Sequence, residues 1–317
     1  MNSSWQSVFV TGCLSFALSL PGARADSNIE GDVEINVDND NVISAAIGSR
    51  ASSSIAAGAV INSDAGGDVS LDVSTQNIIG AAIGSASTSE IQAGTIKDSE
   101  IEGDADITVN TGNIVSAAIG AGVNSRVNLG SVDSSDAGGD VEIDVTTANV
   151  VSAAIGAGAA SDVNAGSLVD SSIGGDASVD VSTGNIISAA IGAGSLSETD
   201  IGSIKNSSVG GDASIQVDTE NIVSAAIGAG VYSDVAVGSV DNSSVGGDVD
   251  IDVSTGNLAS AAIGVGQHSE LKVGNVINTG VGGDVSINVN TGDLAAYSIG
   301  AFRFSAKNKV SIGNVGD

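Results

Sequence analysis

Aliphatic and polar residues alternate strictly at the start of the regular part of this chain. In residues 32–38, DVEINVD, three aliphatic side chains share one face and acidic or amide side chains share the other. Strict alternation over this length predicts a half-buried β-strand. A Thr-Gly-Asn turn, as at residues 111–113, is followed by an apolar run such as residues 114–120, IVSAAIG. A helix fits that run by pattern alone, but its short length and flanking glycines favour a second strand.

The pattern recurs with a period of 36 residues, with no insertion or deletion before its last copy. A fixed period of this length is the signature of a repeat architecture. Because every unit is made of strand segments, we predict an all-β fold, a β-solenoid of eight 36-residue repeats. The expected organisation is a signal peptide over 1–25, a lead-in over 26–30, seven regular repeats over 31–282, and an atypical eighth repeat with a C-terminal cap over 283–317. The copies begin at Gly31, Gly67, Gly103, Gly139, Gly175, Gly211, Gly247 and Gly283.

A weaker half-period of 18 residues suggests two coils in each repeat. Val150 and Ile155 are echoed by Leu168 and Ile173. Electrostatics points the same way, because one coil per repeat would stack equivalent carboxylates about 4.8 Å apart, where each pair repels by about 0.9 kcal/mol even in water. We therefore expect two 18-residue coils per repeat, with one coil as the alternative. The equivalent aspartates are Asp32, Asp68, Asp104, Asp140, Asp176, Asp212, Asp248 and Asp284.

The composition restricts which residues can form the core and which classes of partner the chain can bind. Aromatic residues make up only 2% of the chain and the apolar fraction is 42%, so the core must be built from Val, Ile and Ala. Small β-branched residues suit thin, stacked strand layers. The net charge of −29 argues against binding to nucleic acid or an anionic membrane surface, since no basic patch is present to meet phosphates. Acidic, Gly-rich chains are often disordered, and disorder of the monomer is the alternative to a folded rod.

The first 25 residues have the pattern of a secretory signal. Residues 8–10 and 13–20 give an apolar stretch that Pro21-Gly22 breaks, and Ala23-Arg24-Ala25 is a small-x-small cleavage site. Residues 10–13, VTGC, also resemble a lipoprotein cleavage box, with Cys13 as the lipidated residue. No later run approaches the roughly 20 apolar residues of a membrane-spanning helix. We expect a secreted or cell-surface protein, with the periplasm as the alternative and no transmembrane segment in the mature chain.

The eighth copy departs from the other seven. Tyr297 stands where other copies have Ala, and about three residues are inserted before Val310. Terminal repeats must hide or blunt an open sheet edge. We therefore expect Tyr297, Phe302, Arg303 and Phe304 to form a C-terminal cap, with an assembly or secretion contact as the alternative.

One Asn occupies the same position in seven repeats and is replaced by Asp293 in the last. Side-chain amides in stacked coils can bond to their counterparts above and below, and such ladders stabilise cross-β stacks. A turn Asn that tolerates a left-handed backbone is the equally weighted alternative. The row is Asn41, Asn77, Asn113, Asn149, Asn185, Asn221 and Asn257.

Neither a repeated catalytic pair nor a cofactor site is predicted. A serine row is unbroken, but the chain has one histidine, His268, so a Ser/His pair in every repeat is excluded. The Gly-Gly-Asp motif invites a calcium interpretation, since oxygen ligands suit that ion. One Asp per 36 residues supplies too few ligands, so we expect at most loosely bound Ca²⁺ at the Asp row and no cofactor. The serine row is Ser53, Ser89, Ser125, Ser161, Ser197, Ser233, Ser269 and Ser305.

Two families share short motifs with these repeats. Residues 116–122, SAAIGAG, with Ser125 and Val127 after them, resemble the head repeats of trimeric autotransporter adhesins. That resemblance implies a left-handed β-roll that binds host surfaces, although the period of those heads is shorter. Residues 111–117 resemble the Gly-x-x-Asn-x-Ala run of curlin-type subunits, which implies secretion and polymerisation as a β-solenoid functional amyloid. The regular Gln rows of curlins are missing here.

These observations predict an exported structural or adhesive protein and not an enzyme. We expect copies to assemble end to end into an extracellular fibre for cell adhesion or biofilm, through the exposed strand edges of the terminal coils. Self-association is the expected partner interaction, with secretion or anchoring factors as further partners. A monomeric surface adhesin or binding module is one alternative. A β-helix carbohydrate-active enzyme is the other, although such sites need loops that break the repeat.

Overall fold

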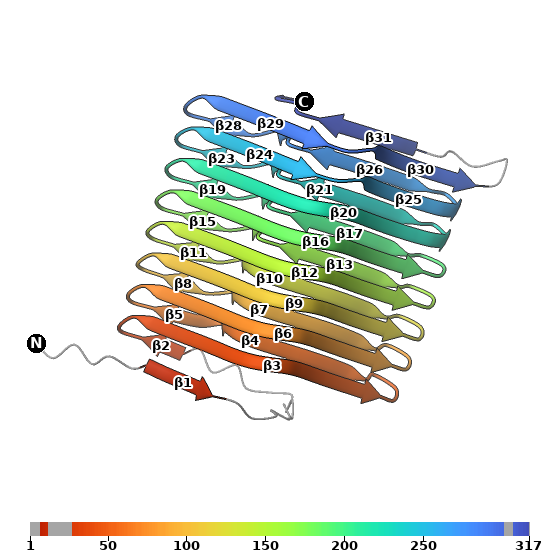
Figure 1. Cartoon of the computed structure of the whole chain (residues 1–317), viewed down its shortest axis with the longest axis horizontal. Coiled ribbons are helices and arrows are strands. Elements are labelled where there is room, and N and C mark those ends of the chain that lie inside the picture. The colour runs from red at the N-terminus through yellow and green to blue at the C-terminus, as the bar shows by residue number, and fades with distance from the viewer. Residues whose placement is uncertain (1–6, 12–26, 301–306, 317) are drawn as a thin grey trace, which may run out of the picture.

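The alternating segments form the walls of a β-solenoid in which each 36-residue repeat makes one coil (Figure 1). The computed structural model describes residues 7–11, 27–300 and 307–316. Every regular element in this part of the chain is a strand, and every pairing between coils is parallel. The all-β solenoid prediction is confirmed, and with it the choice of strand over helix for the second apolar run.

The register contradicts the expectation of two 18-residue coils per repeat. Val141 pairs with Ala177, and Val150 pairs with Ile186, so the offset between neighbouring coils is 36 residues. Eight such coils at about 4.8 Å each make a stack roughly 38 Å tall. Equivalent aspartates can stack at this spacing because they are not a row of free charges. The carboxylates from Asp32 to Asp248 each accept a backbone N–H from the next coil, and that bond offsets the repulsion.

A long sheet of 11 strands forms one wall and carries the first two predicted segments of each repeat. Its side chains alternate between core and solvent because successive residues of a strand point to opposite faces. Its strands are β1 (Ser7–Thr11), β3 (Val33–Ile47), β6 (Val69–Ile83), β9 (Ala105–Ile119), β12 (Val141–Ile155), β16 (Ala177–Ile191), β20 (Ala213–Ala229), β24 (Val249–Thr255), β25 (Leu258–Val265), β29 (Val285–Thr291) and β30 (Leu294–Gly300).

The Thr-Gly-Asn segment does not end a strand in most coils, contrary to the sequence prediction. β9 runs unbroken through residues 111–113, and only the alternation changes phase there. Thr111 and Ile114 are both buried, so the inward set moves from odd to even residues. Ladder bonds from both neighbouring coils keep the backbone extended through this corner. A Cβ on Gly112 would lie 1.9 Å from the Gln76 carbonyl oxygen, so a side chain there would force this corner of the two coils to shift.

A second sheet of 12 strands, here called the bent sheet, forms the opposite wall. Its strands turn at glycines with positive φ, such as Gly94 at +57° and Gly202 at +53°. The strands are β4 (Ser52–Ile61), β7 (Thr88–Lys97), β10 (Asn124–Asp133), β13 (Ala160–Ala165), β14 (Leu168–Val169), β17 (Leu196–Ile201), β18 (Ile204–Lys205), β21 (Tyr232–Val237), β22 (Val240–Asp241), β26 (His268–Val273), β27 (Val276–Ile277) and β31 (Lys307–Ile312).

A narrow sheet of eight short strands closes each coil before the next Gly-Asp step. Together the three sheets enclose one continuous column of Val, Ile, Leu and Ala side chains, most of them fully buried. The strands of the narrow sheet are β2 (Ser27–Ile29), β5 (Ser63–Ala65), β8 (Glu100–Ile101), β11 (Asp136–Ala137), β15 (Ser172–Ile173), β19 (Ser208–Val209), β23 (Ser244–Val245) and β28 (Gly280–Val281).

Candidate functional surfaces

The predicted Asp row forms a hydrogen-bonded ladder along one corner of the solenoid. The Asp140 backbone N–H donates to Oδ1 of Asp104 at 2.8 Å, and the Asp176 N–H donates to Oδ1 of Asp140 at the same distance. The bond repeats from Asp32 to Asp284 at 2.7–3.1 Å. The glycine before each Asp makes room for the carboxylate of the previous coil, since a Cβ on Gly175 would lie 1.9 Å from Asp140 Oδ1. The carboxylates therefore act as backbone acceptors.

The described residues contain no group of three or more His, Cys, Asp or Glu side chains placed to share a metal ion. Each Asp of the ladder has only equivalent Asp residues as neighbours along the axis, one per coil. The Asp row thus supplies one carboxylate per coil, whereas Ca²⁺ takes six to eight oxygen ligands.

The predicted Asn row is also a ladder. Nδ2 of Asn149 donates to Oδ1 of Asn113 at 2.9 Å, and the same bond joins Asn41 to Asn257 through every coil at 2.7–3.2 Å. At the last coil, the Asp293 backbone N–H donates to Asn257 Oδ1 at 2.9 Å. The amides are half-buried or exposed, not enclosed in the core. The ladder lies where the long strands change phase, so it fastens this corner of each coil to the next.

Among the described residues, no strand pairs with the outer edge of β29 in the eighth coil. In interior coils the first residue of the long strand donates its N–H to the next coil, as Val249 does to the Asp284 carbonyl at 2.8 Å. Val285 occupies this position in the last coil, and no described strand pairs with its outer edge. Val285, Ile287 and Val289 are half-buried, whereas the equivalent residues one coil earlier are at most 1% exposed.

Of the four predicted cap residues, only Tyr297 lies in the described part of the chain. It sits on β30, where its backbone pairs with Ala261, and its side chain is 53% exposed. Phe302, Arg303 and Phe304 lie outside the described residues. Tyr297 points outward on the face of the long sheet, so it does not cover the open edge of its own coil.

From Ser53 to Ser269 the serine row faces inward and joins a second serine row that the sequence analysis did not single out, whereas Ser305 lies outside the described residues. Ser125 donates to Ser116 at 2.8 Å, Ser152 donates to Ser125 at 2.9 Å, and the pattern alternates between the long and bent sheets. The resulting chain of buried hydroxyls runs from Ser89 to Ser269 with Oγ–Oγ distances of 2.8–3.1 Å. Each hydroxyl is satisfied by another serine, so the row is a structural seam between the two sheets.

His268 does not approach this seam, because it lies on the outward side of β26. Its ring stacks on Tyr232 with centroids 4.4 Å apart, and Nε2 lies 3.6 Å from Glu270 Oε2. His268 and the neighbouring Ser269 therefore point to opposite sides of β26.

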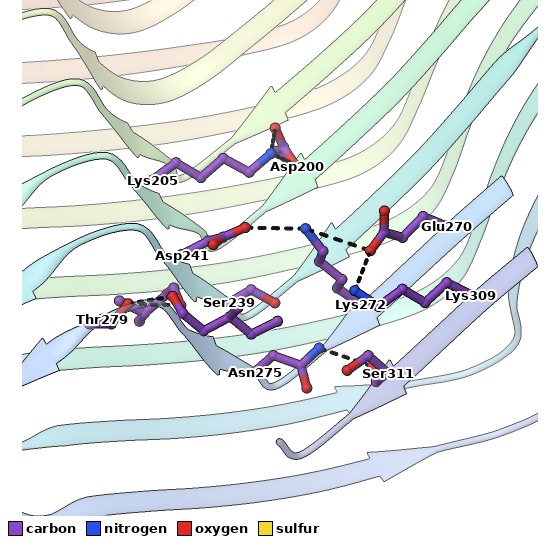
Figure 2. A network of polar contacts seen from close by, with 12 residues as sticks. Asp200, Lys205, Ser239, Asp241, Glu270, Lys272, Asn275, Thr279, Lys309 and Ser311 are labelled. Atoms are coloured by element: carbon purple, nitrogen blue, oxygen red, sulfur yellow. Dashed lines mark hydrogen bonds and ion pairs between the residues drawn. The ribbon is translucent and has the colours of Figure 1, made fainter. Parts of the chain in front are cut away.

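A charged cluster on the outward side of the bent sheet is the main site that the sequence analysis missed (Figure 2). Both carboxylate oxygens of Asp200 accept from Lys205 Nζ at 2.6 Å, across the turn at Gly202. Further along the axis, Lys272 Nζ lies 3.1 Å from Asp241 Oδ2 and 3.8 Å from Glu270 Oε1. The cluster comprises Asp162, Glu198, Asp200, Lys205, Asp234, Asp241, Glu270, Lys272 and Lys309.

Burial sets the titration of this cluster. Burial raises the pKa of Asp200 to about 7 against the opposing charge of Lys205, and burial with the Glu198 charge raises the pKa of Asp162 to about 6. Burial alone would lower the pKa of Lys205, but the Asp200 carboxylate raises it above the ordinary lysine value. Glu270 shows the reverse balance, because Lys309 and Lys272 hold its pKa below normal despite burial. Burial therefore favours the protonated form of Asp162, whereas the neighbouring lysines favour the charged form of Glu270.

A signal for the cluster was present in the repeat positions. Lys97 and Lys205 lie three whole periods apart, and Arg126, Asp162, Glu198, Asp234 and Glu270 follow one another at 36-residue steps. Charges at equivalent positions of adjacent coils must be neighbours once the coil is known to be 36 residues long. The expectation of 18-residue coils hid this relation.

Comparison with known proteins adds no relative: no family model, no curated protein and no solved structure matches the chain. Within residues 7–11, 27–300 and 307–316, no helix of the length and hydropathy needed to cross a membrane is present.

Proposed function

We propose that this protein is an exported structural or adhesive β-solenoid whose copies stack end to end into an extracellular fibre. The open edge of the eighth coil carries this proposal. Its row of Val285, Ile287 and Val289 continues the aliphatic column of the core without burying it. An unpaired strand edge with alternating aliphatic residues is a template for a further strand.

The N-terminal end supplies the matching surface once the predicted leader is removed. β3 begins the aliphatic column with half-buried Val33 and Ile35. Its outer edge pairs with β1, whose residues 7–11 lie inside the predicted signal peptide. Cleavage after residue 25 would free this edge of β3. Export and the capacity to assemble would then begin with the same event, in the setting of surface attachment or a biofilm matrix.

The test is fibre growth by the chain that begins at residue 26. Purified protein should form fibres whose growth rate rises with concentration, followed by negative-stain microscopy and amyloid-dye fluorescence. Ile287→Pro should abolish growth, because this residue shares the orientation of Val285 and its N–H therefore points to the open edge. The substitution leaves the ladder to the seventh coil intact, since proline is tolerated on an edge strand whose N–H faces solvent.

Ile287→Val is the matched control and should grow like the parent chain. Growth of Ile287→Pro at the parental rate, with unchanged circular dichroism, would contradict end-to-end docking. Isolated particles of the parent chain at every concentration would favour a monomeric adhesin instead.

A further inference from the structure

Beyond the corner at the Asn ladder, the long strands point small and polar side chains into the core and larger aliphatic side chains toward solvent. In β12, Ser152 and Ala154 point into the core, while Val151 and Ile155 point outward. The same arrangement recurs in β16, where Ser188 is buried and Ile191 is 39% exposed. The larger aliphatic side chains are therefore on the outside of this half of the sheet, and the hydroxyls are on the inside. Hydrophobic burial favours the opposite arrangement for a wall that faces water.

The outward side chains form a continuous apolar face, here called the Ile–Ala–Ile face. It consists of three columns, which start at Ile43, Ala45 and Ile47 and recur every 36 residues through eight coils. Three columns in eight coils give 24 positions, of which 23 are aliphatic and one is Tyr297; none is charged. Twelve of the 17 exposed large hydrophobic side chains in the described part of the chain lie on this face.

The other half of the same sheet has an ordinary outward surface. In β12, the outward residues before the corner are Glu142, Asp144 and Thr146, all exposed. The Asn ladder marks the boundary between this acidic half and the Ile–Ala–Ile face. A chain with a net charge of −29 thus confines a large uncharged surface to one side. At about 3.3 Å per residue and 4.8 Å per coil, the face measures roughly 16 Å by 38 Å, or about 600 Å². This is at the upper end of the largest apolar patch on a typical monomer, and such patches are often functional.

We infer that a second copy of this chain covers the Ile–Ala–Ile face with its own. Two such faces bury about 1,200 Å² in total, the lower end of the range for stable interfaces. Their columns have the same spacing along the axis, so the Ile column of one copy can lie in the shallow groove along the Ala column of the other. A two-fold axis makes the contact self-complementary. The acidic halves then lie outside the contact.

This lateral contact is independent of end-to-end stacking. The Ile–Ala–Ile face runs parallel to the solenoid axis, whereas the proposed docking edges lie at its two ends. A side-by-side pair therefore leaves both edges free, and blocking an edge leaves the face intact.

The test measures the association state of the full-length chain carrying Ile287→Pro, with reductant present because of Cys13. Sedimentation velocity between 1 and 100 μM should give a dimer, and Kd should fall as salt is raised from about 50 to 500 mM, because screening weakens repulsion between acidic copies. Adding Ile155→Lys and Ile191→Lys, in two central coils, should weaken dimerisation at least 50-fold. Thr146→Lys and Ser182→Lys place the same two charges on the acidic half of the same strands and should leave the dimer intact.

A monomer throughout this range, or equal dissociation in both double variants, would overturn the inference. A species larger than a dimer would overturn the two-copy packing. Circular dichroism checks that the variants keep their strand content. If the lysine pair does not fold, Ile155→Ser with Ile191→Ser should still weaken the dimer. Loss of fibres with retention of the dimer separates failure of stacking from failure of this contact.

Discussion

At the scale of single residues, equivalent side chains gain their roles from the coil above and below. One Asp, one Asn or one Ser has little structural consequence alone, but at a 36-residue interval each meets its own copy at hydrogen-bonding distance. Glycine completes this arrangement where an added Cβ would strike the neighbouring coil or the core.

Substitution of two glycines in one coil can distinguish the cost of backbone strain from the cost of steric overlap. Gly194 and Gly202 both have positive φ, but a Cβ on Gly194 meets nothing within 4 Å, whereas a Cβ on Gly202 would lie 2.4 Å from Val217 Cγ2. Ala86 occupies the position of Gly194 in another coil with φ of +53°. We expect Gly194→Ala to lower the free energy of unfolding by about 1 kcal/mol and Gly202→Ala by about 2 kcal/mol more. Urea denaturation measures both, and equal losses would contradict the packing argument.

The Asp ladder predicts different effects for two substitutions at one site. Asp140→Ala removes the acceptor for the Asp176 N–H and should cost about 1–2 kcal/mol of unfolding free energy. Asp140→Asn keeps an oxygen at that place and removes one charge from an acidic row, so it should be nearly neutral. Equal destabilisation by both in urea would show that the charge, and not the acceptor, matters. A calcium site would instead be shown by stabilisation with Ca²⁺ beyond that of NaCl at equal ionic strength.

At the scale of elements, the bent sheet is where charged side chains become buried. The turn at Gly202 brings outward side chains of β17 and β18 together, so Asp200 is only 5% exposed although it points away from the core. Such buried ion pairs add little net stability, but the loss of one partner is costly.

The raised pKa values of this sheet predict a stability that declines with rising pH. Asp162 holds its proton in the folded chain up to about pH 6, whereas ordinary aspartates in the unfolded chain lose theirs near pH 4. The folded state therefore binds more protons in this window, and the free energy of unfolding should fall as pH rises from about 4 to 6. Asp162→Asn should flatten part of this slope and stabilise the protein by about 1 kcal/mol at pH 8.

The exposed Asp136 provides the control for this prediction. Asp136→Asn should leave the shape of the pH profile unchanged. The measurement is the urea midpoint from pH 4 to 8, and a profile for Asp162→Asn that parallels the parent would contradict the assignment.

At the scale of the whole molecule, the solenoid is a one-dimensional stack whose coils touch only their neighbours. Stability is then the sum of the stabilities of single coils and of the contacts between them, and whole coils can be removed without changing the rest. The fixed coil length also makes this architecture sensitive to any deletion that is not a multiple of it.

Two deletions test the coil length directly. Removal of residues 139–174 takes out one whole coil and should leave a cooperative β-rich fold with somewhat lower stability. Removal of residues 139–156 would place bent-sheet segments against the long sheet of the next coil and should abolish cooperative unfolding. Circular dichroism and urea denaturation measure both, and a stable fold for the 18-residue deletion would contradict one coil per repeat.

The sequence by itself determined that the chain is a β-solenoid. A strict two-residue alternation within a 36-residue period admits few other architectures, since each strand must bury one face and every copy must do so alike. The Asp and Asn rows were also visible, because equivalent residues of stacked coils must be neighbours at some level of the stack. The sequence did not decide how many residues make a coil. The weak 18-residue hydrophobic pattern and the repulsion between aspartates both favoured two coils per repeat, but neither takes account of the backbone N–H groups that bond to those carboxylates.

Only the tertiary structure decided which side chains of the long and bent sheets face the core and which face solvent. The phase change at the Asn corner sends Ser116 inward and Val115 outward, reversing what hydrophobicity alone would assign to that strand. The turn at Gly202 likewise brings Asp200 and Lys205 together from either side of a sheet bend. Both depend on local backbone geometry, which contacts between coils impose and which alternation along the chain does not encode.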